Sequence, residues 1–145
     1  MQHNRKLLIS AAGTRKTKHW PETEILWSEF IDRVKTPVRS TETLEEYLAL
    51  PKYQQDELKD VGGFVGGTFE NNIRKSAYVK GRDLLTLDMD HIPAGGTEEV
   101  LKRVSGLGCA ALVYSTRKHA GYAPRLRVIV PLDVTASADE YEPAA

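Results

Sequence analysis

Two aspartates, separated by one residue, end an apolar run in the stretch TLDMDHI, residues 86–92. Side chains alternate along a strand, so Asp88 and Asp90 are expected on one face, with Leu87 and Met89 on the other. Two carboxylates about 7 Å apart repel each other and raise each other's pKa, unless a bound divalent cation removes that cost. Oxygen ligands of this kind suit Mg²⁺ or Mn²⁺. The pair therefore predicts a metal site, and the alternative is that both acids merely end a strand.

A second group of reactive side chains lies in YSTRKHAGYAPRLRVIVPL, residues 114–132. Arg125 and Arg127 are expected on one face of a strand, where two arginines among apolar residues are costly unless they meet anions. The arginine fork binds phosphate bidentately, and His119 in the preceding loop can donate to a phosphate oxygen. We therefore expect one site in which the metal and these cations share a triphosphate. The alternative is an exposed sheet face on which both arginines pair with surface acids.

Regular elements must position these two groups. The second half of the chain has the patterns of three strands, at residues 83–90, 109–115 and 125–131. A helix is indicated between the first two strands, at residues 97–105. This β-α-β unit with a further strand favours an α/β (α+β) fold, in which an RRM-like β-α-β-β sheet at residues 81–145 packs on an N-terminal helical and α/β module at residues 1–80. Cys109 would open a buried strand.

The N-terminal half contains weaker patterns. Residues 6–10 are typical of a short strand, and apolar residues from Trp27 to Val34 recur at helical spacing behind Pro21 and Glu22. Two further helices are indicated by a capping box at Thr43 and Glu46 and by Pro51 in a first turn. VGGFVGG, residues 61–67, does not fit a phosphate-loop pattern and predicts a tight turn beside a short strand.

Length and composition indicate a single domain. The chain has 145 residues, with twenty Lys and Arg balancing twenty Asp and Glu, so no global field favours an acidic partner or nucleic acid. Its single cysteine excludes a disulfide framework and a cysteine-based zinc cluster. Since no signal peptide or membrane span is indicated, a cytoplasmic protein is expected.

The two reactive stretches together resemble the motifs of archaeo-eukaryotic-type primases. LLTLDMD (residues 84–90) resembles the hydrophobic-D-h-D motif, and YSTRKH with PRLRVIVPL resembles the histidine motif and its following strand. The nearer resemblance, over residues 20–132, is to the primase-polymerase segment of phage and mobile-element replication proteins of the virulence-associated protein E group. It implies DNA primase or polymerase activity, a two-metal, template-directed nucleotidyl transfer, on an α/β module joined to an RRM-like sheet.

By this resemblance, Asp88 and Asp90 are catalytic and hold Mg²⁺ or Mn²⁺, and His119 binds the nucleotide. We add Arg125 and Arg127 as contacts to the triphosphate or the template. The nucleotide-binding set is then His119, Arg125, Arg127, Ser115 and Lys118. The implied partners are nucleoside triphosphates, a single-stranded or primed DNA template and a C-terminal superfamily 3 helicase region in a longer chain.

Two features depart from the family pattern. Arg117 stands two residues before the histidine, where the family has a small residue. The family also uses a third acid on a later strand, for which Asp133 is the candidate metal ligand in this chain. If that acid lies beyond residue 145, the site is incomplete. A capping box at residues 137–140, close to the end of the sequence, also favours a truncated fragment.

Two other functions remain as alternatives. DMDHI followed by ALVYST resembles the haloacid-dehalogenase-like phosphatases, in which the first aspartate attacks phosphate, although Ile92 stands where that motif has Thr or Val. A non-catalytic nucleic-acid-binding module would instead use basic side chains on phosphates and would ignore Mg²⁺ and nucleotide. Its candidate residues are Arg15, Lys16, Lys18, Arg117, Lys118, Arg125 and Arg127.

Overall fold

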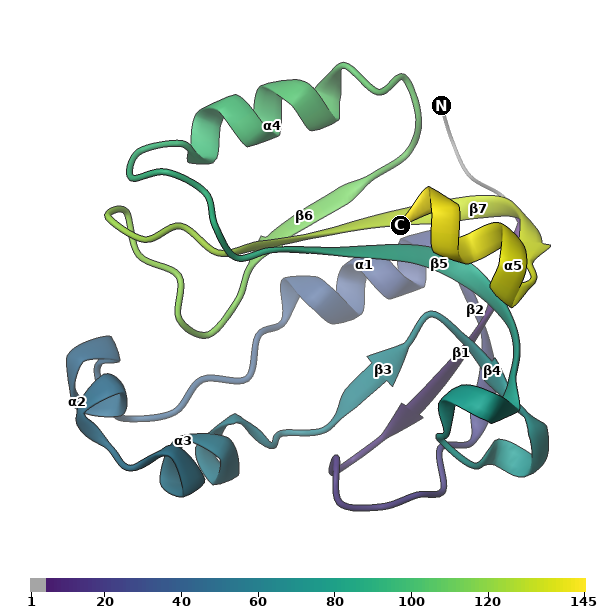
Figure 1. Ribbon diagram of the computed structural model, residues 1–145, viewed down its shortest axis with the longest axis horizontal. Coiled ribbons are helices and arrows are strands. Elements are labelled where there is room, and N and C mark those ends of the chain that lie inside the picture. Colours follow the sequence, from purple (N-terminus) through teal and green to yellow (C-terminus); the bar gives the residue numbers. More distant parts are fainter. Residues whose placement is uncertain (1–4) are drawn as a thin grey trace.

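A computed structural model describes residues 5–145, which form two antiparallel sheets and five α-helices (Figure 1). Strands and helices are mixed along the chain, so the predicted α+β class is confirmed at that level. Short 3-10 turns also occur, at Glu70–Asn72, Ser76–Tyr78 and Glu142–Ala144.

The first sheet has the strand order β2-β1-β3, with β1 (Lys6–Ala12) between β2 (Glu22–Leu26) and β3 (Gly63–Val65). The helical spacing predicted from Trp27 to Val34 is confirmed, whereas the sequence predicts no strand where β2 lies. Residues of β2 are extended because they pair with β1 in register, and the helix begins only at Trp27. Long-range strand pairing here outweighs a weak helix-start pattern.

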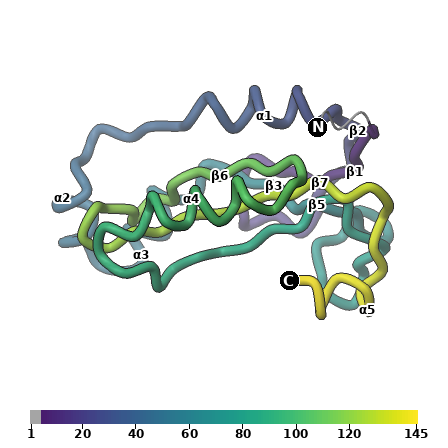
Figure 2. Tube along the Cα trace, turned by 90° about the horizontal axis from the view of Figure 1, so that it is seen from above, coloured from purple at the N-terminus to yellow at the C-terminus, as the bar shows by residue number. Residues whose placement is uncertain are grey.

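Three helices connect β2 to β3: α1 (Trp27–Lys35), α2 (Leu44–Ala49) and α3 (Lys52–Lys59). The predicted capping box is confirmed, since the Thr43 hydroxyl accepts from the Glu46 amide and the Glu46 carboxylate accepts from the Thr43 amide. α1 runs along one side of the molecule, opposite the C-terminal helix, while α2 and α3 lie at one end (Figure 2).

The second sheet has the order β4-β5-β7-β6 and carries the predicted β-α-β-β unit. Its strands are β4 (Gly67–Phe69), β5 (Val79–Met89), β6 (Leu112–Ser115) and β7 (Leu126–Ala136), with α4 (Thr97–Ser105) after β5 and α5 (Ala138–Tyr141) after β7. The bounds of α4 are those that the sequence predicts. β6 starts three residues later than expected, so Cys109 precedes the strand and is exposed rather than buried.

The core lies where the two sheets and α1 meet. It is built from the buried side chains of Leu7, Ile9, Ile25, Trp27, Phe30, Leu84 and Ile129. Phe30 contacts Trp27 in a stacked arrangement and Phe64 edge-on. Burial of these large side chains supplies the main driving force for holding the sheets together.

Asp83 on β5 joins the two sheets through hydrogen bonds. Its side chain is 2% exposed, and its oxygens accept from the Leu8 amide at 2.7 Å, the Arg5 guanidinium at 2.8 Å and the Thr135 hydroxyl at 2.6 Å. Burial raises the pKa of Asp83, but these three donors outweigh it, so the pKa lies below the usual value of an aspartate. A buried anion with every oxygen satisfied fixes how β1 meets β5.

The stretch VGGFVGG forms the predicted turn and short strands. Gly62 has a φ of +87°, which favours glycine. A Cβ at Gly66 would lie 2.5 Å from the Leu84 Cβ, and one at Gly67 would lie 2.1 Å from the Gly81 carbonyl oxygen. These two glycines therefore serve close backbone packing between the two halves of the chain.

None of the helices within residues 5–145 has both the length and the apolar character needed to cross a membrane.

Candidate nucleotide and nucleic-acid site

An open groove of about 880 Å³ lies beside one face of the second sheet. Two walls enclose it. The sheet wall consists of Asp88, Asp90, Arg125, Arg127 and residues 114–118. The helical wall comes from the end of α1, the segment leading into α2, and the end of α3, and comprises residues 33–40, 42–44, 47, 58, 59 and 61.

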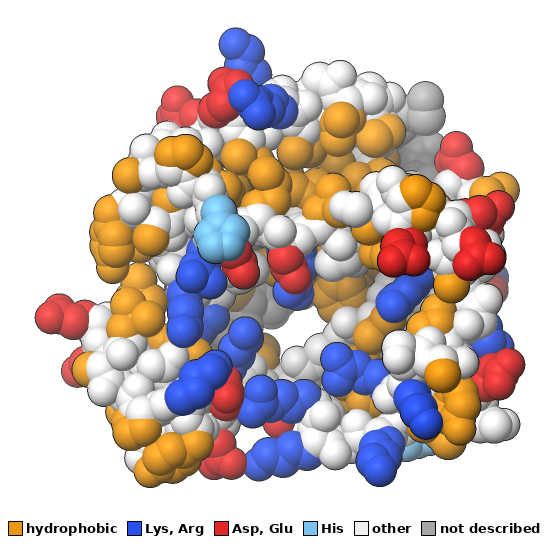
Figure 3. Space-filling model, in the orientation of Figure 1, with side chains coloured by type: hydrophobic (Ala, Val, Ile, Leu, Met, Phe, Trp, Pro, Cys, Tyr) orange, Lys and Arg blue, Asp and Glu red, His pale blue; other side chains and the backbone are white. Residues whose placement is uncertain are grey.

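The groove is strongly basic. Eight of its lining residues are lysines or arginines, namely Arg33, Lys35, Arg39, Lys59, Arg117, Lys118, Arg125 and Arg127, against the three acids Glu42, Asp88 and Asp90. Lys and Arg side chains gather around the hollow in the middle of the face shown in Figure 3. A concave surface with this excess of positive charge attracts phosphate groups.

Strand register brings the predicted site residues together. Asp88 on β5 lies directly opposite Arg127 on β7, which in turn lies opposite Tyr114 on β6. Opposite residues of antiparallel strands point to the same face, so the three side chains share the sheet wall. The fold therefore places Asp88 and Arg127 side by side, and their common role in binding stays a prediction.

Asp88 and Arg127 form a two-pronged ion pair. The Arg127 Nε donates to Asp88 Oδ1 at 2.5 Å, and Nη2 donates to Oδ2 at 3.0 Å. The hydrogen bond to Asp88 raises the pKa of Arg127, burial opposes this, and the Tyr114 hydroxyl, at 3.4 Å from Nη1, adds to the increase. Arg127 thus remains a cation, and half of the Asp88 side chain, 52%, is exposed to the groove.

Asp90 and Arg125 form a looser pair beside the first. The Arg125 Nη1 lies 3.6 Å from Asp90 Oδ1, and the two side chains are 38% and 49% exposed respectively. Pairing of both arginines with acids is the alternative raised by the sequence. The structure shows both pairings, and both pairs face the same basic groove.

Arg117 fastens the loop between β6 and β7 to the helical wall. Its guanidinium pairs with Glu42 and lies over the Tyr47 ring, 4.4 Å from the centroid. Tyr47 is buried, and its hydroxyl donates to the Gln55 carbonyl at 3.2 Å. Arg117, which stands where the family pattern has a small residue, thus has a structural role. The neighbouring Ser115 and Lys118 line the groove.

His119 lies in the same loop but is not among the residues that line the groove. Its Nδ1 is 3.1 Å from the Arg125 amide nitrogen and 3.2 Å from the Arg125 carbonyl oxygen. When Nδ1 accepts from the amide, the proton of a neutral imidazole is on Nε2. His119 therefore braces the backbone at Arg125, and its predicted nucleotide contact stays a prediction.

Asp133 does not join the other two acids. Asp88 lies opposite Arg127, and Asp133 is six residues further along β7, which corresponds to roughly 20 Å of extended strand. Within the described part of the chain, no group of three or more His, Cys, Asp and Glu side chains is placed to hold a metal ion. The prediction of Asp133 as a third ligand beside Asp88 is therefore incompatible with the strand register.

The donor set of Asp88 and Asp90 nevertheless fits a metal ion that arrives with a nucleotide. Mg²⁺ is commonly bound through one or two carboxylates, with substrate phosphates and water completing its coordination. Both carboxylates are about half exposed at the groove. Because both Asp88 oxygens accept from Arg127, an ion there would compete with the guanidinium, which would be freed for a phosphate.

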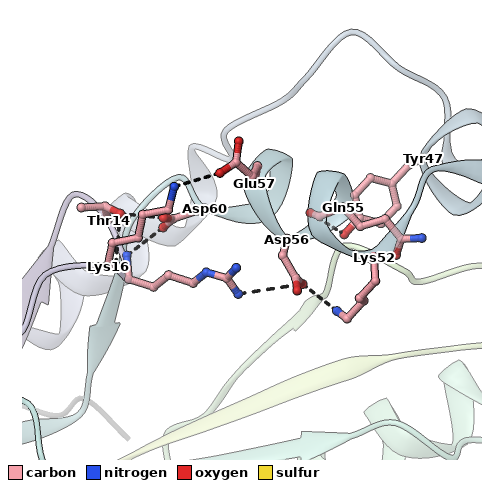
Figure 4. Close-up of polar contacts among 9 residues, drawn as sticks. Thr14, Lys16, Tyr47, Lys52, Gln55, Asp56, Glu57 and Asp60 are labelled. Atoms are coloured by element: carbon pink, nitrogen blue, oxygen red, sulfur yellow. Dashed lines mark hydrogen bonds and ion pairs between the residues drawn. The ribbon is translucent and has the colours of Figure 1, made fainter.

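Sequence reasoning missed the basic residues of the helical wall. Arg33, Lys35 and Arg39 lie within RVKTPVR, residues 33–39. This stretch contains no acidic residue, and that local excess of positive charge could have indicated them. By contrast, two of the three proposed phosphate contacts near the N-terminus, Arg15 and Lys16, pair with acids outside the groove. Lys16 pairs with Glu57 of α3 at 2.9 Å, as Figure 4 shows, and Arg15 lies 3.8 Å from Asp56.

Taken together, the fold and groove define an α+β domain with a basic groove on one face. The chain belongs to the VapE N-terminal domain family, whose model matches residues 1–145. No curated protein and no solved structure matches the chain.

Proposed function

We propose that this domain binds a nucleoside triphosphate with Mg²⁺ or Mn²⁺ and carries out primase-type nucleotidyl transfer on a DNA template, as part of a phage or mobile-element replication protein. The observation that carries the proposal is the meeting of two half-exposed carboxylates and their arginines in one basic groove. Membership of the VapE N-terminal domain family supports the replication context.

The chain's own residues divide into two roles. Asp88 and Asp90 would hold the divalent ion, and the two arginines, once drawn away from these acids, would bind the triphosphate bidentately. Lys118 and Ser115, on the same wall, supply a further charge and a hydroxyl for phosphate oxygens. When bound, the metal would lower the pKa of an attacking hydroxyl and stabilise charge on the phosphoryl group.

Titration of the chain with a nucleoside triphosphate, in the presence and absence of Mn²⁺, tests this proposal. Binding should require the metal and should disappear in the double variant Asp88→Asn with Asp90→Asn. A matched control is Asp32→Asn with Asp139→Asn, which removes the same charge from exposed positions outside the groove. Template-directed incorporation of a labelled nucleotide should follow the same pattern.

The result that contradicts the proposal is equally specific. If the groove variant binds metal and nucleotide as well as the control does, Asp88 and Asp90 are not the site. Salt-sensitive binding of nucleic acid that ignores Mn²⁺ and nucleotide would instead identify a non-catalytic module.

A further inference from the structure

The two walls of the groove differ in how their positive charges are compensated. On the sheet wall, Arg117, Arg125 and Arg127 each have a carboxylate partner. On the helical wall, none of the basic residues forms an ion pair with another residue in 5–145; these are Arg33, Lys35, Arg39 and Lys59. All four are exposed.

Helix dipoles account for only part of this arrangement. Arg33 and Lys35 lie in the last turn of α1, and Lys59 lies in the last turn of α3, where a cation is favoured. Arg39, however, lies outside any helix, in the segment between α1 and α2. Like charges gathered along one groove repel each other, and an anion between them removes that cost.

The same wall presents apolar side chains to solvent. Val38 is 68% exposed, Val61 is 56% exposed and Leu58 is 38% exposed, and all three line the groove. Free phosphate or a triphosphate alone offers such side chains nothing to contact. In a duplex the base faces are stacked inside, whereas a single strand exposes them next to its phosphates.

From this pattern we infer that the helical wall binds a single-stranded nucleic acid, with Arg33, Lys35, Arg39 and Lys59 contacting phosphates and the apolar side chains contacting bases. A strand held there faces Asp88 and Asp90 across the groove. The inference rests on the proposed function only in identifying that strand as the template. Its binding requires neither metal nor nucleotide.

Fluorescence anisotropy with a labelled oligothymidylate of about 12 nucleotides, in EDTA, measures this binding directly. If the four wall cations all meet phosphates, the logarithm of the association constant falls against the logarithm of salt concentration with a slope of about −2.8. The double variant Arg39→Gln with Lys59→Gln should reduce that slope by about 1.4 and weaken binding about tenfold at low salt.

A control with the same change in charge separates this surface from general electrostatics. Lys18 and Lys102 are exposed, do not line the groove and form no ion pair within the described residues. The double variant Lys18→Gln with Lys102→Gln should keep the slope of the wild type. Equal thermal unfolding midpoints for both double variants would exclude misfolding as the cause of weaker binding.

Two results would overturn the inference. One is an unchanged slope in the Arg39 and Lys59 variant, and the other is tighter binding of a duplex than of the single strand. The Asp88→Asn and Asp90→Asn variant separates the two proposals, because it should lose nucleotide binding and retain the oligonucleotide. If this variant keeps nucleotide binding, the proposed function fails; if the wild type binds nucleotide but shows no salt-dependent binding of the oligonucleotide, this inference fails.

Discussion

Strand β5 carries two aspartates that each pair with an arginine, and the two pairs lie in opposite environments. Asp83, at the sheet junction, is 2% exposed and accepts from three donors, whereas Asp88, at the groove, is 52% exposed and, among residues 5–145, accepts only from Arg127. A buried anion with several fixed donors cannot exchange partners without loss of stability. An exposed anion can, and this difference separates a structural ion pair from one that is able to change partners.

Removing each carboxylate should have very different effects on stability. Asp83→Ala removes the acceptor of the Leu8 amide and the Thr135 hydroxyl and the carboxylate partner of Arg5, so we expect the free energy of unfolding to fall by about 4 kcal/mol. Asp88→Ala should cost about 0.5 kcal/mol, because its ion pair is exposed. Urea unfolding of the two variants measures both values. Similar losses at the two positions would contradict the distinction.

The junction also depends on a glycine that packs against β5. In Gly66→Ala the new Cβ would lie 2.5 Å from the Leu84 Cβ, so one strand must move and we expect a loss of about 2 kcal/mol. Gly13→Ala is the control, because no heavy atom lies within 4 Å of its Cβ position, and it should change stability by less than about 0.5 kcal/mol. Equal unfolding midpoints for the two variants would show that the close approach at Gly66 is unimportant.

The Asp83 pair should be lost in acid. Its pKa is lower in the folded protein than in the unfolded chain, so the unfolded state binds more protons and stability falls as the pH decreases. The gap in unfolding free energy between the wild type and Asp83→Ala should therefore be constant near neutral pH. Below about pH 4 it should narrow by up to about 1.4 kcal/mol per pH unit. Urea unfolding at successive pH values checks this. If the difference in unfolding free energy widens in acid, the predicted lowering of the Asp83 pKa is wrong.

At the groove, replacing Arg127 should have opposite effects on the binding of metal alone and on the binding of nucleotide. Arg127→Gln frees both Asp88 oxygens, so Mn²⁺ alone should bind about fivefold more tightly, which corresponds to an exposed pair worth about 1 kcal/mol. Metal-dependent nucleotide binding should weaken, because a bidentate phosphate ligand is lost. Calorimetric titration separates the two effects, with Arg103→Gln on α4 as a control that removes an exposed arginine outside the groove. Weaker binding of Mn²⁺ alone by Arg127→Gln would refute the competition.

Much of the local structure could be predicted because it depends on neighbours in sequence. The capping box at Thr43, the bounds of α4 and the shared face of Asp88 and Asp90 follow from spacing within a few residues. β2 was missed because its conformation depends on pairing with β1 rather than on its own pattern. The single domain proposed for the chain stays a prediction.

The sequence by itself determined which residue types are available for chemistry and which of them share a strand face, because alternation along a strand is a property of the backbone. Only the tertiary structure decided their partners. The register of β5 against β7 sets Arg127 opposite Asp88 and carries Asp133 away from it. The helical wall meets the sheet wall only through folding, since residues 33–40 and Arg127 come together over a long separation in the chain.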